Sequence, residues 1–461
     1  MTAAEVAAAT GGRVVSGDAG QRIERWSIDS RALAPGEVFI AIRGERFDGH
    51  DFAAGAFEHG AAGVVVEAAR AAAVAGDRLV IAVDDTTRAL QDVAREVRRR
   101  SGAQVIAITG SAGKTTTKEL TADFLSSRFS VFRNKGNLNN HIGLPLSLLE
   151  LRSRPDMAVV ELGMNHAGEI RTLVGIADPE VRVWTNVGDA HLGFFASADR
   201  IADAKAEILE GARATDRLIA NRDDARIMSR AAAFAGRTVT FGLSEGADVR
   251  ASGVQHRGVD GMAAQLSTTA GSVQVSTPLL GTGNLLNLLA AAAVATEYGV
   301  PLDEIAARAS HARPASHRGE LLRLPGGITL IDDSYNSSPA ALQRALETVK
   351  ASTGSARKVA VLGEMLELGE HSTGLHEQCG RAAGAAGLDL LIAVGGDPAA
   401  RLADAARQAG MADATVLYAP TSNEAADLAL TKVRPGDLVL VKGSRGIRTD
   451  VVVDRLKVEF A

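Results

Sequence analysis

The stretch Gln104–Thr117, QVIAITGSAGKTTT, decides the fold of this chain. It begins with the apolar run QVIAIT, which is typical of a buried parallel strand. A glycine loop follows, and a helical pattern continues from Lys118 to Ser127. Backbone N–H groups of such a loop and the positive end of the helix face the same anion. The sequence therefore predicts a phosphate-binding loop between a strand and a helix.

The residue types in this loop suit a nucleoside triphosphate. Lys114 can reach the β and γ phosphates, and the Thr115 hydroxyl can bind Mg²⁺. The loop departs from the strict phosphate-loop pattern, because Ile108 stands where that pattern has a glycine. The alternative is a chance glycine-rich turn. Lysine is scarce here, with only nine among 50 basic residues and none before Lys114, which favours the functional interpretation.

Apolar runs alternate with helical patterns on both sides of the loop. The fold class predicted from this alternation is α/β, with a small N-terminal α/β domain, a central doubly wound domain carrying the phosphate loop, and a C-terminal Rossmann-like domain. The expected boundaries are 1–83, 84–313 and 314–461. Within the central domain, Val249–Thr277 alternates polar and apolar residues and predicts a small antiparallel appendage.

The composition excludes several classes of protein. The chain has 461 residues, of which 46% are hydrophobic and 23% charged, as in ordinary globular proteins. No apolar run approaches the roughly 18 residues of a membrane span, and the start does not resemble a signal peptide. A net charge of -5 gives no footprint for nucleic acid. The single cysteine, Cys379, agrees with a reducing compartment, so we expect a cytoplasmic protein.

Polar side chains follow several other apolar runs, where the ends of parallel strands gather ligands. Glu161 and His191 come after two runs in the central domain and could bind a metal ion, although a helix cap or a structural role is the alternative for each. In the C-terminal domain, LIDDSYNSSP (330–339) and KGSR (442–445) place carboxylates, amides and cations at strand ends, with turn chemistry as the alternative for the first. Spacing alone favours a solvated helix surface for Lys205.

These segments together resemble one family. TGSAGKTTT, RNKGNLNNHIGLP, ELGMNHAGEI, DAHLGFFAS, GTGNLLN, LIDDSYNSSPAAL, GEMLELGEHS and VLVKGSR occur in this order and span essentially the whole chain. The sequence resembles the Mur ligases of bacterial cell-wall synthesis, most closely the branch that adds D-Ala-D-Ala to UDP-N-acetylmuramoyl-tripeptide. The resemblance implies an ATP-dependent ligase of peptidoglycan synthesis that works through an acyl phosphate. It also implies ATP and Mg²⁺ as cofactors, and we expect a monomer.

The resemblance further assigns roles to single residues. It implies Lys114, Lys205, His191 and Arg318 as catalytic residues, and Thr115, Glu161, His191 and a carbamylated Lys205 as ligands of two Mg²⁺ ions. The nucleotide contacts that it implies are Gly110, Ser111, Ala112, Gly113, Lys114, Thr115, Thr116, Asn284, Asn287, Arg318, Asp333 and Asn336. The substrate contacts are Ser30, Arg31, Asn139, Asn140, Lys442, Ser444 and Arg445. In two departures from the family pattern, Gly283 stands where His is common and His317 where Gly is more usual.

Two other activities and an inactive homologue stay open at this point. The related ligase that adds the third amino acid shares the first domain and the loop, but DDSYN together with GEMLELGEHS favours the dipeptide-adding branch. A phosphate-loop ATPase without ligase activity would not require the SIDSRAL segment (27–33) or a lysine at 205. A catalytically inactive homologue would lose several of the metal-site residues, all of which are present.

Overall fold

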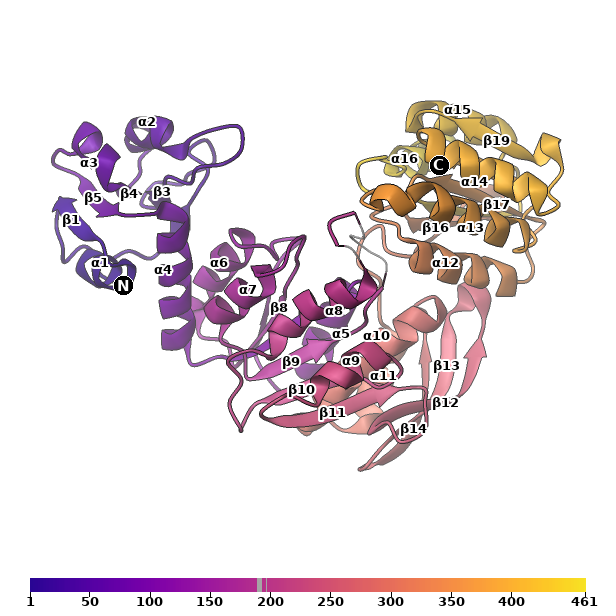
Figure 1. The fold of residues 1–461 in the computed structure, drawn as a ribbon, viewed down its shortest axis with the longest axis horizontal. Coiled ribbons are helices and arrows are strands. Elements are labelled where there is room, and N and C mark those ends of the chain that lie inside the picture. The colour runs from indigo at the N-terminus through magenta and orange to yellow at the C-terminus, as the bar shows by residue number, and fades with distance from the viewer. Residues whose placement is uncertain (189–192, 196) are drawn as a thin grey trace. The chain divides into compact units, whose positions relative to one another are not determined.

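The computed structural model describes residues 1–188, 193–195 and 197–461 (Figure 1). It is an α/β protein with three regions that each contain a sheet, so the predicted fold class is confirmed. The chain forms two compact units. Unit 1 comprises Met1–Ala107, Phe129–Met164 and Gly168–Glu180, and unit 2 comprises Ile108–Arg128, Asn165–Ala167 and Val181–Ala461. The finer division at 83/84 and 313/314 stays a prediction. None of the described helices is long and apolar enough to cross a membrane.

Unit 1 begins with a five-stranded sheet in the order β1-β5-β4-β3-β2. Its strands are β1 (Arg13–Ser16), β2 (Trp26–Ser27), β3 (Val38–Ile40), β4 (Gly63–Glu67) and β5 (Leu79–Val83). The strands β2 to β5 pair in parallel, and β1 is antiparallel to β5. Three apolar runs, EVFIAI (37–42), GVVV (63–66) and LVIAV (79–83), supply β3, β4 and β5, because apolar residues on both faces suit a sheet covered by helices. These helices are α1 (Ala3–Thr10), α2 (Ala53–Glu58) and α3 (Ala68–Val74).

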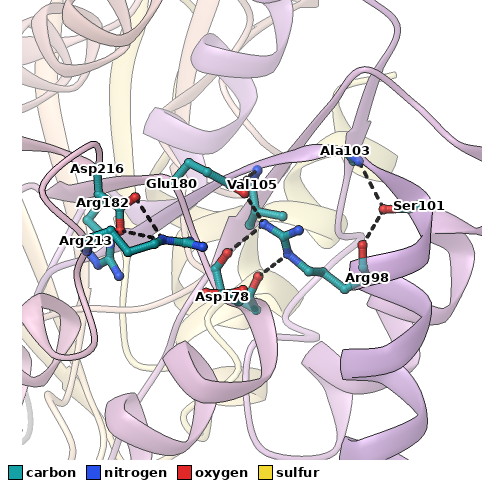
Figure 2. Close-up of polar contacts among 10 residues, drawn as sticks. Arg98, Ser101, Ala103, Val105, Asp178, Glu180, Arg182, Arg213 and Asp216 are labelled. Carbon is teal, nitrogen blue, oxygen red and sulfur yellow. Dashed lines mark hydrogen bonds and ion pairs between the residues drawn. The ribbon is translucent and has the colours of Figure 1, made fainter.

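A long helix, α4 (Thr86–Ser101), leads from this sheet to β6 (Gln104–Thr109). In unit 1, β6, β8 (Met157–Glu161) and β7 (Val131–Arg133) are successive neighbours. The buried Arg98 of α4 ties this part together, as Figure 2 shows. Its guanidinium donates to the carbonyls of Ala177 and Asp178, at 2.8 and 2.6 Å, and to the Glu180 carboxylate at 2.6 Å. These carbonyls end α7 (Glu169–Ala177). The remaining helix of this part is α6 (Gly143–Leu148).

β6 enters unit 2 with its last two residues, Ile108 and Thr109. There the sheet continues through β9 (Val181–Trp184), β10 (Arg217–Asn221) and β11 (Arg237–Gly242), with β9, β10 and β11 in parallel. It ends in β12 (Val249–His256), β13 (Met262–Thr268) and β14 (Gly271–Thr277). Since β13 pairs antiparallel with both β12 and β14, the predicted appendage is confirmed. The helices of this part are α5 (Lys114–Leu125), α8 (Ala198–Ala206), α9 (Ala225–Ala231), α10 (Gly281–Glu297) and α11 (Leu302–Ser310).

A buried ion pair joins β9 to the residue before β10. The Arg182 guanidinium lies 2.8 Å from the Asp216 carboxylate, and both side chains are at most 2% exposed. Arg213 adds a second cation on the same carboxylate at 3.2 Å (Figure 2). Two cations on one carboxylate offset the cost of its burial.

The C-terminal part of unit 2 is a six-stranded sheet in the order β15-β16-β20-β17-β18-β19. Its strands are β15 (Glu320–Leu324), β16 (Ile328–Asp333), β17 (Arg357–Gly363), β18 (Leu390–Val394), β19 (Val416–Ala419) and β20 (Asp437–Lys442). All pair in parallel except β15. Separate apolar cores cover the two faces, and Cys379 lies fully buried in one of them. The helices are α12 (Pro339–Ala351), α13 (Ser372–Gly384), α14 (Asp397–Gln408), α15 (Ser422–Lys432) and α16 (Asp450–Glu459).

Candidate nucleotide and catalytic site

A cavity of about 250 Å³ lies in unit 2 between the predicted phosphate loop, the start of α10 and the ends of β16 and β20. Ten residues that the sequence predicted for this site line it together: Ser111, Ala112, Gly113, Thr116, Asn284, Asn287, Arg318, Asp333, Asn336 and Lys442. Residues that lie up to 331 positions apart in the sequence, from 111 to 442, therefore line one cavity.

The loop needs its glycines for room and for backbone conformation. Gly113 has a φ of +81°, and a Cβ there would lie 2.1 Å from Asn287 Oδ1. At Gly110 a Cβ would lie 2.0 Å from Thr185 Oγ1. Lys114 begins α5 and folds its ammonium back onto the Gly110 carbonyl at 2.9 Å. The close packing at both glycines and the Lys114 contact leave the loop little freedom, and its residues Ser111, Ala112 and Gly113 line the cavity.

Lys205 is buried, which corrects the surface interpretation that spacing alone favoured. Its side chain lies in the last turn of α8 and the residue is only 2% exposed. Burial, and then the charge of Lys114, hold the pKa of the Lys205 amine well below its usual range. The structure thus favours the uncharged amine at this position.

Arg318 and Arg445 lie against the same aromatic ring. The Arg318 guanidinium carbon is 4.0 Å from the centre of the Tyr335 ring, and that of Arg445 is 5.6 Å from it. Both distances allow a cation–π interaction. Tyr335 lines the cavity and was not predicted as a site residue, although it lies inside the quoted segment LIDDSYNSSP. It brings two cations from separate segments toward one place.

The unusual residue at 317 has a physical role. His317 adopts a φ of +61°, a conformation in which glycine is the usual residue. The imidazole Nδ1 lies 2.7 Å from the carboxylate of Asp332, which is 2% exposed. The backbone carbonyl of His317 accepts the Tyr335 N–H at 3.0 Å. These bonds offset the backbone strain and tie the segment before Arg318 to the end of β16.

In the KGSR segment, Lys442 and Ser444 are buried and bonded to other residues, whereas Arg445 is exposed. Lys442 is 3% exposed and donates to Asp333 at 2.7 Å and to the Asn336 carbonyl at 3.0 Å, so its charge is already neutralised. The buried Ser444 hydroxyl accepts the Leu366 N–H at 2.9 Å. The Arg445 side chain is 65% exposed. Of the cations in this segment, Arg445 is therefore the accessible one.

The predicted residues of unit 1 also have partners. Arg31 forms a two-pronged ion pair with Asp29, at 2.9 and 2.8 Å, which holds the pKa of that carboxyl at about 2. Ser30 lies in the same turn. Asn139 donates to Glu161 at 2.8 Å and so orients that carboxylate. The Asn140 side chain accepts the N–H of Gly143 at 2.8 Å, where α6 begins.

The predicted metal ligands are partly described. Thr115 and Glu161 are 9% and 3% exposed, in unit 2 and unit 1, and offer the hard oxygen atoms that Mg²⁺ prefers. His191 lies outside the described residues. Among the residues that the structure describes, no three His, Cys, Asp or Glu side chains form a group that could hold a metal ion. The magnesium ligation stays a prediction.

Two other cavity residues were missed. The Ser337 hydroxyl is buried and has no hydrogen-bond partner in the described structure, although it lines the cavity. A ligand hydroxyl or phosphate oxygen would satisfy it. Arg344 of α12 also lines the cavity. The motif around Ser337 could have pointed to it, whereas nothing local in the sequence distinguishes Arg344 from a surface arginine.

The comparison with known families agrees with this geometry. Three family models match the chain: the Mur ligase family catalytic domain at 22–98, the Mur ligase middle domain at 108–295, and the Mur ligase glutamate ligase domain at 317–445. This chain belongs to the Mur ligase family.

Individual Mur ligases match over nearly the full length. The UDP-N-acetylmuramoyl-tripeptide–D-alanyl-D-alanine ligase of Escherichia coli is 36% identical over 437 residues, 94% of each chain. The crystal structure of MurF from Acinetobacter baumannii has a TM-score of 0.88 at 33% identity and covers 99% of this chain and 98% of that one. MurF from Thermotoga maritima in complex with ADP has a TM-score of 0.84 at 30% identity, with 95% and 98% covered.

Proposed function

We propose that this chain is the ATP-dependent ligase that joins D-Ala-D-Ala to UDP-N-acetylmuramoyl-tripeptide in peptidoglycan synthesis. The cavity in unit 2 carries the proposal, because it combines a phosphate loop with polar strand ends from the C-terminal sheet. The near full-length match to ligases named for this reaction supports the choice of substrates. ATP and the UDP-linked precursor are consumed in the cytoplasm, where we place the protein as a monomer.

The reaction must activate a poor electrophile. An oxygen of the tripeptide carboxylate attacks the γ phosphorus of ATP, and ADP leaves, giving an acyl phosphate. The amine of D-Ala-D-Ala then attacks the acyl carbon and loses a proton, and the resulting tetrahedral intermediate expels phosphate. Phosphoryl transfer needs positioning and charge neutralisation more than covalent help. Lys114 and Arg318 supply positive charge, and the Tyr335 ring holds the Arg318 guanidinium in place.

The nucleotide would lie along the cavity. The loop residues Gly110 to Thr116 would hold the phosphates. Asn284 and Asn287 of α10, whose side chains bond to each other at 3.1 Å, would lie beside the nucleoside. Asp333 and Asn336 would contact the ribose, and the unpaired Ser337 hydroxyl fits an additional polar contact.

Thr115, Glu161, His191 and Lys205 would hold magnesium, Lys205 as its carbamate. Bound Mg²⁺ would neutralise charge on the phosphate oxygens. The uncharged amine that the burial of Lys205 favours can add to CO₂ with loss of one proton, which turns the side chain into an anion with oxygen ligands. Ser30, Arg31, Asn139 and Asn140 are the proposed contacts of the UDP-peptide, and Lys442, Ser444 and Arg445 those of the remaining substrate.

Phosphate release tests the proposal directly. We expect release from ATP only when UDP-N-acetylmuramoyl-tripeptide and D-Ala-D-Ala are both present, with the UDP-pentapeptide seen by mass spectrometry. Lys114→Ala should lower this rate on the order of a thousandfold, because transition-state charge loses its partner. The UDP-peptide should still bind to that variant. The proposal would be contradicted if phosphate were released at the same rate without D-Ala-D-Ala, or if Lys114→Ala released phosphate at the wild-type rate.

A further inference from the structure

Arg344 lies in the wall of the nucleotide cavity, with the carboxylates of Glu347 and Asp333 near enough to act on its charge. The residue belongs to α12 and is half-buried. Within the described part of the chain, its guanidinium makes neither a hydrogen bond nor an ion pair. Burial lowers its pKa, against the charges of Glu347 and Asp333, but a guanidinium stays charged at neutral pH. A cation that is half withdrawn from water with no acceptor is costly unless a ligand meets it.

The neighbouring helix leaves room for this side chain. A Cβ at Gly283 of α10 would lie 3.1 Å from Arg344 Nε and 3.3 Å from its Cδ. Both contacts are tighter than ordinary van der Waals contact. A Cβ at 283 would therefore push the arginine side chain aside by a few tenths of an ångström, and a larger side chain by more, whereas the glycine leaves it in place.

Arg344 lies on the side of the cavity that faces away from the phosphate loop. Along α10, Asn287 touches the phosphate loop, since its amide oxygen bonds to Thr117 Oγ1 at 3.3 Å. Gly283, which lies beside Arg344, precedes it by four residues, about 6 Å of helix, and Leu280 lines the same cavity three residues further away. Around this far end are Leu280, Gly281, Gly283, Ala345 and Thr348, which are small or apolar residues that suit the flat face of a base.

We propose that Arg344 binds the base of the nucleotide by stacking its planar guanidinium on the ring, and that Gly283 is required for this position. The inference rests on the proposed function and names the residue that holds the base. Guanidinium planes stack on aromatic rings, and their attraction to the π-system grows where water is excluded. Stacking does not depend on the identity of the base, so Arg344 should add affinity for any purine nucleotide.

Calorimetric binding separates a base contact from a phosphate contact. We expect Arg344→Met to weaken ATP binding about tenfold and to leave the binding of inorganic triphosphate, which has no base, unchanged. Methionine keeps the apolar stem, so the fold should survive, as circular dichroism will check. Lys350→Met, an exposed position on the same helix, is the matched control and should bind both ligands like the wild type.

Gly283→Ala supplies a second test that leaves Arg344 in the chain. We expect Gly283→Ala to weaken ATP binding. The double variant Gly283→Ala/Arg344→Met should bind ATP no more weakly than Arg344→Met alone, because both substitutions act on the same contact. Unchanged ATP binding by Arg344→Met, equal losses for ATP and triphosphate, or fully additive losses would each overturn the inference. A wild type that binds ATP but makes no pentapeptide would overturn only the proposed ligase function, and one that binds no ATP would overturn both.

Discussion

At the scale of single residues, the proposed magnesium site depends most on the amine of Lys205, which is buried in the last turn of α8. The sequence around Lys205 predicted a helix, and the structure has α8 at this place. The buried face of that helix could not be predicted, because the residues that cover it come from distant parts of the chain. By contrast, the loop residues Gly110 to Thr116 were predictable, since a glycine loop between a strand and a helix carries its structure in local sequence.

Substitution of Lys205 tests whether it acts as a carbamate. We expect Lys205→Ala to be strongly impaired in ligase activity and to be partly restored by a small carboxylic acid in solution. Lys205→Arg should be impaired and not restored, because arginine cannot form the carbamate. Steady-state rates with and without acetate provide the measurement. Wild-type activity in Lys205→Arg would remove the carbamate from the mechanism.

The buried amine also makes stability depend on pH. Because folding lowers the pKa of Lys205, the unfolded chain binds more protons between the folded-state pKa and 10.5. In CO₂-free buffer, the penalty from this lysine is full below its folded-state pKa and disappears as pH rises toward 10.5. Lys205→Met should therefore be stabilising at pH 7, with the gain falling by at most about 1.4 kcal/mol per pH unit. Urea unfolding from pH 7 to 10 measures this, and a gain independent of pH would contradict it.

At the scale of elements, apolar runs located most strands but not their ends. The apolar character of the sequence continues from 181 to 187, whereas β9 ends at Trp184, and Asn186 beyond it lines the cavity. The strands β1, β7 and β15 escaped prediction because they are short and only partly buried, so their sequences lack a clear period.

The contact between α4 and the end of α7 lends itself to a stability test. Arg98→Met would remove the guanidinium that donates to the carbonyls of Ala177 and Asp178 and to the Glu180 carboxylate. We expect a loss of about 2–4 kcal/mol in the free energy of unfolding. Arg99→Met, at an exposed position on the same helix, should stay within about 0.5 kcal/mol of the wild type. Equal effects of the two variants in urea denaturation would refute the structural role of Arg98.

At the scale of the whole molecule, the nucleotide cavity is lined by residues of unit 2 alone. A nonhydrolysable ATP analogue should therefore slow amide hydrogen exchange in the loop after β6, at the start of α10 and in the segment 317–345. The first sheet of unit 1 should keep its exchange rates until UDP-N-acetylmuramoyl-tripeptide is added. Mass spectrometry of peptic fragments resolves these regions, and early protection of β3 or β4 by the analogue alone would be the contrary result.

The single guanidinium at the far end of the cavity also bears on selective inhibition. A competitive inhibitor with a carboxylate or sulfonamide at that end would find in Arg344 a half-buried charge that meets no other acceptor in the described structure. An enzyme with a bulkier residue at the position of Gly283 would push this arginine out of its place, and the same compound would bind more weakly. A difference of one side chain between two otherwise similar pockets is a basis for compounds that discriminate between bacterial species.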